Sequence, residues 1–184
     1  MPNDTDTDSD LIDGWRRGEE SAAAALIRRH AGSVARFLHA AGADGDDVED
    51  LVQETFFRAF RRIETFRGGS TFRTWVIAIG SNVLKDTWRK RSRQSVIPLD
   101  GRDFADESMD PFAESEAREM ERRLAKGVQG LSPMQRDVFL LRAQQGVDYD
   151  EIAKVLRTSP GAARVHYHHA VQRLKKVLSV ELET

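Results

Sequence analysis

Apolar side chains recur at the three- and four-residue spacing of an α-helix along two long stretches of this chain, residues 11–93 and about 114–180. Neither stretch contains the strict alternation of apolar and polar residues that marks a β-strand. Between them, residues 94–113 carry Pro98, Pro111 and many acids, a composition typical of a linker. The sequence therefore predicts an all-α protein made of two small helical domains joined by a flexible acidic linker.

Composition sets the expected boundaries of these parts. Residues 1–10 alternate Asp with Thr or Ser and have little to bury, which predicts a disordered acidic tail. We place the first helical domain at residues 11–93, the acidic linker at 94–121 and the second domain at 122–180.

Charge is segregated along the chain, although the formal net charge is only −2. Residues 58–93 hold ten Lys/Arg against two acids, and residues 122–180 hold eleven against four. The intervening residues 99–121 carry nine acids and two Arg. Two basic blocks joined by an acidic strip favour two modules that face one polyanion, with solvated helix faces as the alternative.

Several classes of protein are disfavoured by what the sequence lacks. The absence of cysteine excludes disulfides, thiolate zinc sites and cysteine nucleophiles. There is no phosphate-binding loop signature, nucleophile elbow or paired His/carboxylate metal motif, so we predict neither an enzyme nor a cofactor. No apolar run approaches the roughly 20 residues that span a bilayer, and the acidic N-terminus does not fit a signal peptide. We therefore expect a cytoplasmic protein without membrane insertion.

Helix boundaries are clearly marked in the second half of the chain. Residues 132–135 (SPMQ) combine an N-cap Ser, Pro at the first helical position and Gln placed for a capping box. This helix is expected to end at Gly146, Asp148 to cap a short helix, and Ser159 with Pro160 to begin the last one. Three helix starts so close together predict a compact bundle.

The helix predicted over residues 48–63 has two distinct faces. One side is a continuous apolar stripe suited to a core, made of Val48, Leu51, Val52, Thr55, Phe56, Ala59, Phe60 and Ile63. The opposite side carries Asp50, Gln53, Glu54, Phe57 and Arg61. An outward Phe57 would forgo about 1.5–3 kcal/mol of burial unless a partner covers it. The pattern indicates either a protein-docking patch or an ordinary solvated face.

The same region resembles a known family. Residues 50–56 (DLVQETF), 58–60 (RAF), 66–68 (FRG), 72–76 (FRTWV) and 78–82 (AIGSN) closely resemble the first conserved domain of extracytoplasmic-function (ECF) sigma factors of the sigma-70 family. The resemblance implies that Asp50, Gln53 and Glu54 dock on the clamp helices of the largest catalytic subunit of RNA polymerase. These three residues lie on the outward face derived from spacing, to which Phe57 and Arg61 also belong.

A glycine-containing loop and a basic helix follow. The helix expected over residues 71–91 ends in several cations, which suit DNA phosphates. In the family, the loop and this helix capture a base flipped from the minus-10 element of the promoter. The resemblance thus assigns minus-10 contacts to Phe66, Arg67, Gly68, Gly69, Ser70, Asn82, Lys85 and Arg89. For Asn82, pairing of its amide with a base and capping of local backbone both remain open.

The last predicted unit is a helix-turn-helix. Residues 150–156, a short turn and residues 159–163 fit this motif, with Ala153 and Ala163 small where the helices cross. Residues 131–178 resemble the second conserved domain of the same family, which reads the minus-35 element. The residues expected to face outward and contact that DNA are Arg164, Val165, His168, His169 and Gln172.

This segment also departs from the family. Strongly basic residues are usual at the positions of His166 and His169, so the run His166-Tyr167-His168-His169 is unusual. Arg157 and Thr158 replace the usual glycine and apolar residue in the turn. We therefore expect the minus-35 specificity to differ from that of the family. Only His166 and His169 share a helix face, without a nearby Cys or carboxylate, so no metal site is predicted.

Together these features predict a transcription initiation factor that binds core RNA polymerase and delivers it to double-stranded and melted promoter DNA. The resemblance also implies a sequestering anti-sigma factor as a partner. The main alternative is a stand-alone helix-turn-helix regulator whose N-terminal domain senses a ligand or dimerises. A pure interaction protein is a third interpretation, which the two basic blocks disfavour.

Overall fold

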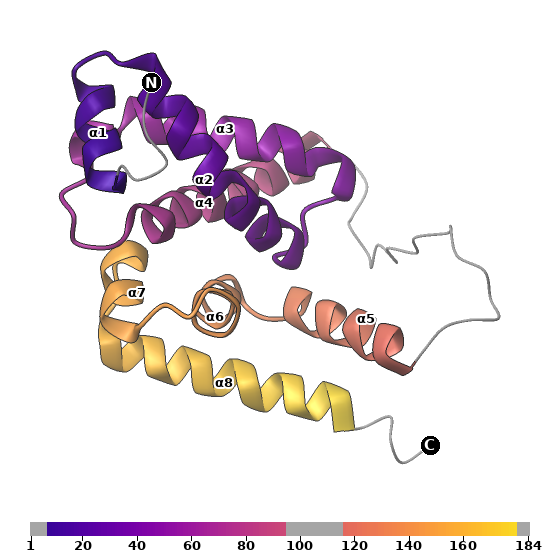
Figure 1. Ribbon diagram of the computed structural model, residues 1–184. Helices are drawn as coiled ribbons and strands as arrows, with labels where there is room; N and C mark the ends of the chain where they lie inside the picture. The colour runs from indigo at the N-terminus through magenta and orange to yellow at the C-terminus, as the bar shows by residue number, and fades with distance from the viewer. Residues whose placement is uncertain (1–6, 95–115, 180–184) are drawn as a thin grey trace.

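The computed structural model describes residues 7–94 and 116–179, and all regular structure in these two ranges is helical (Figure 1). The first domain consists of α1 (Asp8–Arg16), α2 (Glu20–Ala40), α3 (Val48–Arg61) and α4 (Phe72–Gln94). The second consists of α5 (Glu116–Gln129), α6 (Pro133–Phe139), α7 (Tyr149–Leu156) and α8 (Pro160–Ser179). The predicted all-α, two-domain fold is confirmed. Within the described ranges, no helix has both the length and the apolar character needed to cross a membrane.

The core of the first domain lies among α2, α3 and α4. Phe37 of α2 and Val76 of α4 are almost completely buried, and the apolar stripe of α3 packs against them through buried Leu51, Phe56 and Ala59. Thr55 is also fully buried, and its hydroxyl donates to the carbonyl of Leu51 at 2.6 Å, which satisfies its polar atom. The two-faced helix expected over residues 48–63 is therefore present, with its aliphatic side inward.

The N-terminal end corrects one prediction. Residues 7–10 are not disordered, because Thr7 and Asp10 form a capping box at the start of α1. Asp8 Oδ1 lies 2.8 Å from Arg29 Nη1, and Asp8 Oδ2 lies 2.8 Å from His30 Nε2 on α2. Burial opposes ionisation of Asp8, but its bonds to Arg29 and His30 outweigh burial and lower the pKa of the carboxyl. Sequence reasoning treated these acids as solvated and missed the local capping box of Thr7 and Asp10, while the partners of Asp8 lie in the next helix. The remainder of the predicted tail, residues 1–6, lies outside the described residues.

The boundary between linker and second domain also shifts. Helix α5 begins at Glu116, so residues 116–121, predicted as linker, are already helical. Within it, Glu119 accepts a hydrogen bond from Arg123 at 2.7 Å, the i, i+4 pairing typical of an exposed helix. The linker residues before Glu116 lie outside the described residues.

The predicted helix caps of the second domain are confirmed. Ser132 and Gln135 form a capping box, Asp148 accepts from the backbone N–H of Glu151 at 2.8 Å, and the Ser159 hydroxyl accepts from that of Ala162 at 3.1 Å. Gly146 adopts a left-handed conformation with φ of 69°. The helix that begins at Pro133 continues past Phe139 as a π-helical turn over Leu140–Gln144 before that glycine reverses the chain.

Arg157 occupies the turn of the helix-turn-helix with φ of 54° and ψ of 50°, the left-handed conformation that favours glycine. A residue with a Cβ atom loses roughly 1–2 kcal/mol of stability in this conformation. Glycine avoids that loss, but it gives up more backbone entropy on folding, which offsets part of the gain. Arg157→Gly is therefore expected to raise the free energy of unfolding by about 1 kcal/mol in urea denaturation. Arg157→Ala, which keeps the Cβ atom, should change it little. Equal stability of the two variants would contradict this explanation.

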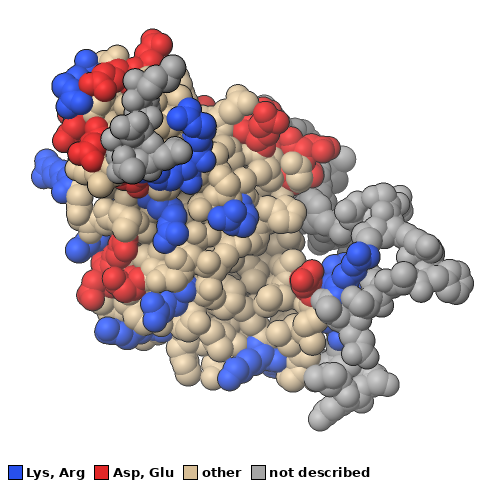
Figure 2. All heavy atoms as spheres, viewed as in Figure 1, with Lys and Arg blue, Asp and Glu red and all other residues tan. Residues whose placement is uncertain are grey.

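The two domains contact each other through α4. Asp137 of α6 is buried and accepts hydrogen bonds from Ser81 Oγ at 2.8 Å and from Lys85 Nζ at 2.5 Å. Next to it, the guanidinium of Arg136 lies 5.1 Å from the ring centroid of Trp88. The space-filling view shows the domains in contact, with acidic side chains gathered near the start of α3 and beside α7 (Figure 2). The domain interface therefore includes a buried polar contact, with a carboxylate from the second domain and two donors from the first.

Candidate nucleic-acid and protein-binding surfaces

The outward face of α3, made of Asp50, Gln53, Glu54, Phe57 and Arg61, lies at the surface as predicted. The Phe57 side chain is 56% exposed, although it is large and apolar. The guanidinium of Arg61 lies 5.5 Å from the centre of its ring. A shallow pocket opens on this face between the two side chains and Glu54. An exposed aromatic ring flanked by charges is a combination that protein interfaces favour.

Arg58 organises this face, and sequence reasoning missed it. Its Nε donates to Glu54 at 2.6 Å, and its Nη1 donates to Asp86 of α4 at 2.8 Å. Hydrogen bonds to Asp86 and Glu54 raise the pKa of the guanidinium. The i, i+4 spacing of Glu54 and Arg58 could have predicted their ion pair, but no local sequence pattern predicts the bond between Arg58 and Asp86. The carboxylate of Glu54 is thus held in place on the face.

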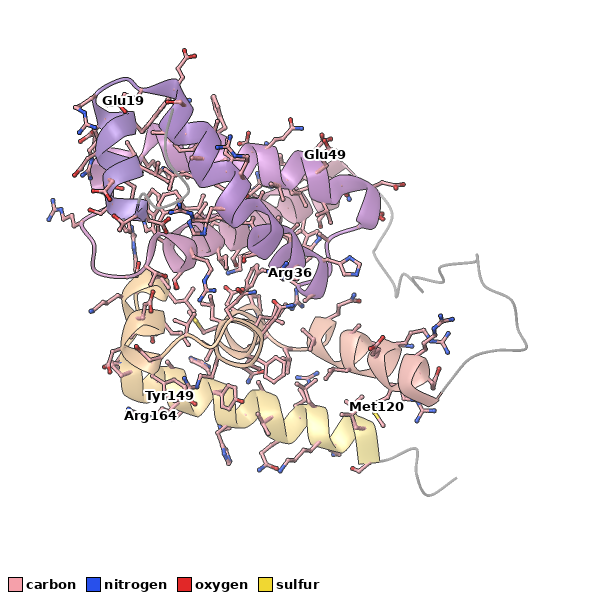
Figure 3. The ribbon with its side chains drawn as sticks, viewed as in Figure 1. Glu19, Arg36, Glu49, Met120, Tyr149 and Arg164 are labelled. Carbon is pink, nitrogen blue, oxygen red and sulfur yellow. The ribbon has the colours of Figure 1, made fainter. Side chains whose placement is uncertain are left out.

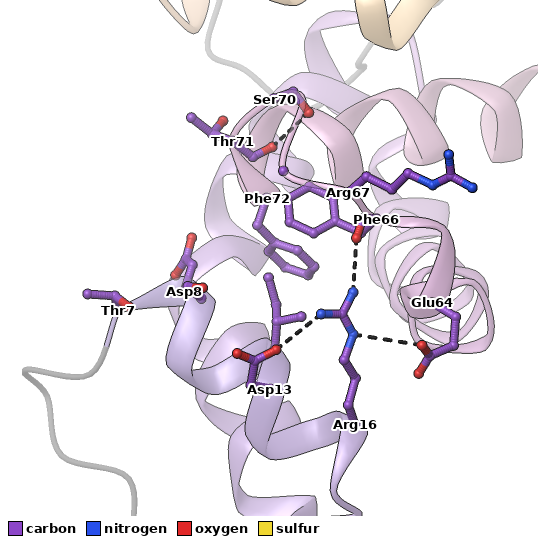
Figure 4. Close-up of a pocket in the computed structure, with 13 residues that line it drawn as sticks. Thr7, Asp8, Asp13, Arg16, Glu64, Phe66, Arg67, Ser70, Thr71 and Phe72 are labelled. Carbon is purple, nitrogen blue, oxygen red and sulfur yellow. Dashed lines mark hydrogen bonds and ion pairs between the residues drawn. The ribbon is translucent and has the colours of Figure 1, made fainter.

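The loop after α3 borders an open pocket of about 750 Å³ (Figure 4). Phe66, Arg67, Gly68 and Ser70 all line it, as does Phe72 at the start of α4. The Phe66 ring is fixed edge-on to that of Phe72, with centroids 5.9 Å apart and planes at 85°. The loop therefore presents aromatic and polar groups around one hollow.

Helix α1 supplies the other wall of this pocket. Arg16 Nη2 donates to the carbonyl of Phe66 at 2.9 Å, and Arg16 Nη1 donates to Asp13 at 3.1 Å. Figure 4 shows the Arg16 guanidinium between Asp13, Glu64 and the Phe66 backbone. Arg16 and Phe66 are 50 residues apart, so nothing in the local sequence pairs them. The loop conformation depends on this arginine.

The remaining residues predicted for minus-10 DNA do not belong to the pocket. Gly69 is exposed but is not among its lining residues. Asn82 and Arg89 are exposed on α4, where Arg89 pairs with Asp86 at 3.3 Å. Lys85 is bound to Asp137 of the second domain. The structure thus divides the predicted set between a loop pocket and the surface of α4, and two of its cations, Lys85 and Arg89, already have intramolecular partners.

The helix-turn-helix has the predicted packing. Ala153 of α7 and Ala163 of α8 are buried where the two helices meet. The side chains predicted to contact minus-35 DNA are all exposed on α8, namely Arg164, Val165, His168, His169 and Gln172. Val165 is 52% exposed, unusual for an aliphatic side chain. Over residues 7–94 and 116–179 no cluster of metal-ligating side chains occurs.

An aromatic and cationic cluster beside α8 was not predicted. The Tyr149 ring lies under two guanidinium groups, those of Arg142 at 5.0 Å and Arg164 at 5.2 Å. Figure 3 shows Tyr149 and Arg164 next to each other. Because the three residues come from separate elements, helical spacing does not reveal the cluster.

Comparison with known proteins gives matches to both domains. The model described as Sigma-70 region 2 matches residues 26–94, and the one described as Sigma-70, region 4 matches residues 121–174. The ECF RNA polymerase sigma factor SigX of Bacillus subtilis (strain 168) is 30% identical over 146 residues, covering 77% of this chain and 75% of SigX. The RNA polymerase sigma factor CarQ of Myxococcus xanthus is 28% identical over 173 residues, or 94% of this chain and 98% of CarQ.

Solved structures show the same architecture. CnrH, in complex with the cytosolic domain of CnrY, superposes with a TM-score of 0.72 at 26% identity, covering 96% of this chain and 99% of that one. The sigma factor RpoE from Bartonella quintana, in complex with the anti-sigma factor NepR, shares the fold with a TM-score of 0.66 at 21% identity, covering 85% and 96% of the two chains.

Proposed function

This chain belongs to the ECF group of the sigma-70 family and directs RNA polymerase to promoters, and from that premise we propose how its two domains divide the task. Residues 11–93 hold the polymerase and capture the minus-10 element, and residues 122–180 read the minus-35 element. The chemistry of RNA synthesis remains with the polymerase. The observation that carries the proposal is the outward face of α3, where a half-exposed phenylalanine stands among fixed charges.

We assign polymerase docking to Asp50, Gln53, Glu54, Phe57 and Arg61. Leaving Phe57 in water forgoes about 1.5–3 kcal/mol, which covering it with a partner recovers. Glu54 is held by Arg58, so little side-chain entropy is lost when it meets a cation of the polymerase. An apolar anchor with prearranged charges around it is the arrangement expected at the centre of a protein interface.

The loop pocket suits a base unstacked from the minus-10 element. Phe66 offers an aromatic ring, and Arg67 and Ser70 offer donors beside it. Flipping a base out of the duplex costs a few kcal/mol, and stacking returns about 1–3 kcal/mol per base. On α4, the side chains that would contact the adjacent DNA strand are those of Asn82, Lys85 and Arg89. Lys85 would release Asp137 and bind a phosphate instead.

Helix α8 suits the major groove at the minus-35 element. The first turns of such a second helix reach base edges, and these turns expose Arg164, Val165, His168 and His169. Arg164 can donate two hydrogen bonds to a guanine, and Val165 can contact a thymine methyl group. His169 attracts phosphate less than the basic residue usual at its position does, which lowers affinity, while hydrogen bonds from His168 and His169 to base edges would change the preferred minus-35 sequence.

We further propose a cytoplasmic location and an anti-sigma factor as the regulatory partner. CnrH and RpoE, which share this architecture, form complexes with CnrY and the anti-sigma factor NepR. A protein of this kind would cover the exposed Phe57 and its charged neighbours, and so compete with the polymerase for α3.

Promoter-dependent run-off transcription tests the proposal. Core polymerase with this chain should produce discrete transcripts that core polymerase alone does not. Arg164→Ala should lower transcript yield by about 10-fold or more, since one good bidentate base contact is worth ~1–3 kcal/mol. Loss of specificity should be confined to one minus-35 position. If the chain instead bound its target duplex as a dimer and ignored core polymerase, it would act as a stand-alone regulator.

A further inference from the structure

Tyr149 lies at the centre of the charged surface beside the DNA-reading helix. It is the first residue of α7 and is half-buried. The guanidinium carbons of Arg142 and Arg164 lie 5.0 and 5.2 Å from its ring centre, within the range of cation–π attraction. One ring therefore contacts two cations, one of which belongs to the proposed base-reading set.

The Tyr149 ring is itself held firmly. Asp148 caps the first turn of α7, which fixes the backbone next to the ring. Tyr167 of α8 meets the ring edge-on, with centroids 6.1 Å apart, and stacks in turn on Phe139 of α6 at 6.0 Å. The ring thus rests on aromatic side chains from two other helices, and it can serve as a fixed support.

The two arginines lack carboxylate partners among the described residues. Arg142 Nη1 donates to the carbonyl of Val147 at 3.0 Å, which anchors it beside the ring. The two guanidinium groups bring two positive charges to one ring, where a single anion can approach both. A DNA phosphate supplies that anion, so the pair is suited to a nucleic acid.

We infer that Tyr149 is a positioning residue for minus-35 recognition: its ring orients Arg164 toward the base edges and keeps Arg142 beside it for the backbone. This inference rests on the proposed role of α8. A free arginine side chain loses up to about 2 kcal/mol of rotamer entropy when it is ordered, and a support that orders it beforehand reduces this loss on binding.

A double-mutant cycle on the holoenzyme tests the inference. Tyr149→Leu should weaken binding to the cognate promoter by about 3- to 10-fold, in line with the loss of one or two exposed cation–π contacts. It should also reduce discrimination at the one minus-35 base that Arg164→Ala identifies. Tyr149→Phe keeps the ring and should bind like the natural chain. In the Arg164→Ala background, Tyr149→Leu should add less than about 2-fold, because the supported side chain is absent.

The possible results distinguish a Tyr149 ring that positions Arg164 from one that is only structural. If Tyr149→Leu weakened binding equally at every minus-35 variant and by the same factor without Arg164, the ring would be only structural and the inference would be wrong. If Tyr149→Phe were as damaging as Tyr149→Leu, the hydroxyl and not the ring would act, again overturning it. If Arg164→Ala itself changed no base preference, the proposed base-reading role of α8 would be wrong, and the inference about Tyr149 would be wrong with it. Thermal unfolding followed by circular dichroism identifies a variant that does not fold, and Tyr149→Met then provides a longer, more adaptable replacement without a ring.

Discussion

An arginine in place of Glu54 is expected to lower the affinity of this sigma factor for core RNA polymerase by about 30-fold or more. Glu54 borders the exposed Phe57 ring, so a reversed charge there meets the polymerase at the centre of the docking face. Breaking one partner of a desolvated interfacial charge pair costs about 2–5 kcal/mol, and each 1.4 kcal/mol is tenfold in affinity. Fluorescence anisotropy with labelled sigma factor and increasing core polymerase measures the effect.

Loss of binding through unfolding can be separated from loss of the contact. Arg58 keeps its bond to Asp86 when Glu54 is replaced, and an exposed i, i+4 ion pair contributes only about 0.3–0.5 kcal/mol. The variant should therefore unfold at nearly the same urea concentration as the natural chain. Asp50→Arg should reproduce the loss. Glu121→Arg makes the same charge reversal at an exposed position of α5 in the second domain and should bind normally. Undiminished polymerase binding by Glu54→Arg would refute the docking assignment.

The second large effect is expected at the domain interface. Asp137→Lys would place an ammonium group against Lys85 in a site where Asp137 is only 3% exposed. Replacing a buried ion pair by two like charges costs at least the roughly 3–5 kcal/mol of an unpaired buried charge. We expect the two domains to separate. Because the chain has no cysteine, single cysteines at exposed Ala24 and Lys175 can carry a dye pair that reports the distance by energy transfer.

Two further variants show whether the charge is responsible. Adding Lys85→Asp to Asp137→Lys restores an ion pair of reversed polarity and should bring the dyes together again. Asp137→Asn keeps the shape and can still bond Ser81, so it should open the interface less. If energy transfer stayed high in a folded Asp137→Lys variant, the carboxylate would not hold the domains together. If Lys85 binds a promoter phosphate as proposed, the same contact couples the domain interface to promoter binding, because Lys85 is bonded to Asp137.

Local sequence determined the helices and their ends. Helical spacing identified the buried stripe of α3 through Leu51, Phe56 and Ala59, because a core-facing helix repeats every 3.6 residues. Ser132 and Asp148 marked helix starts because an N-cap bonds within its own first turn. The outward Phe57 could be predicted for the same reason, since one helix fixes which side chains oppose its core face.

Contacts between distant segments required the tertiary structure. The start of the first helix was missed although its capping box, Thr7 with Asp10, is local, whereas the partners of Asp8 lie on α2, 21 and 22 positions further along the chain. Arg16 in the loop pocket and Lys85 against Asp137 join residues 50 and 52 positions apart. Such bonds depend on which helices pack together and at what angle. The helical repeat shows which side of a helix is buried, but not which residues of another helix it meets.

The sequence by itself thus determined the capped helix starts of the second domain and the buried side of α3, because those properties depend on neighbours within a few residues. Only the tertiary structure decided which side chains from different helices meet. Arg16 behind the loop, Arg58 between Glu54 and Asp86, and Tyr149 under Arg164 all owe their places to that packing.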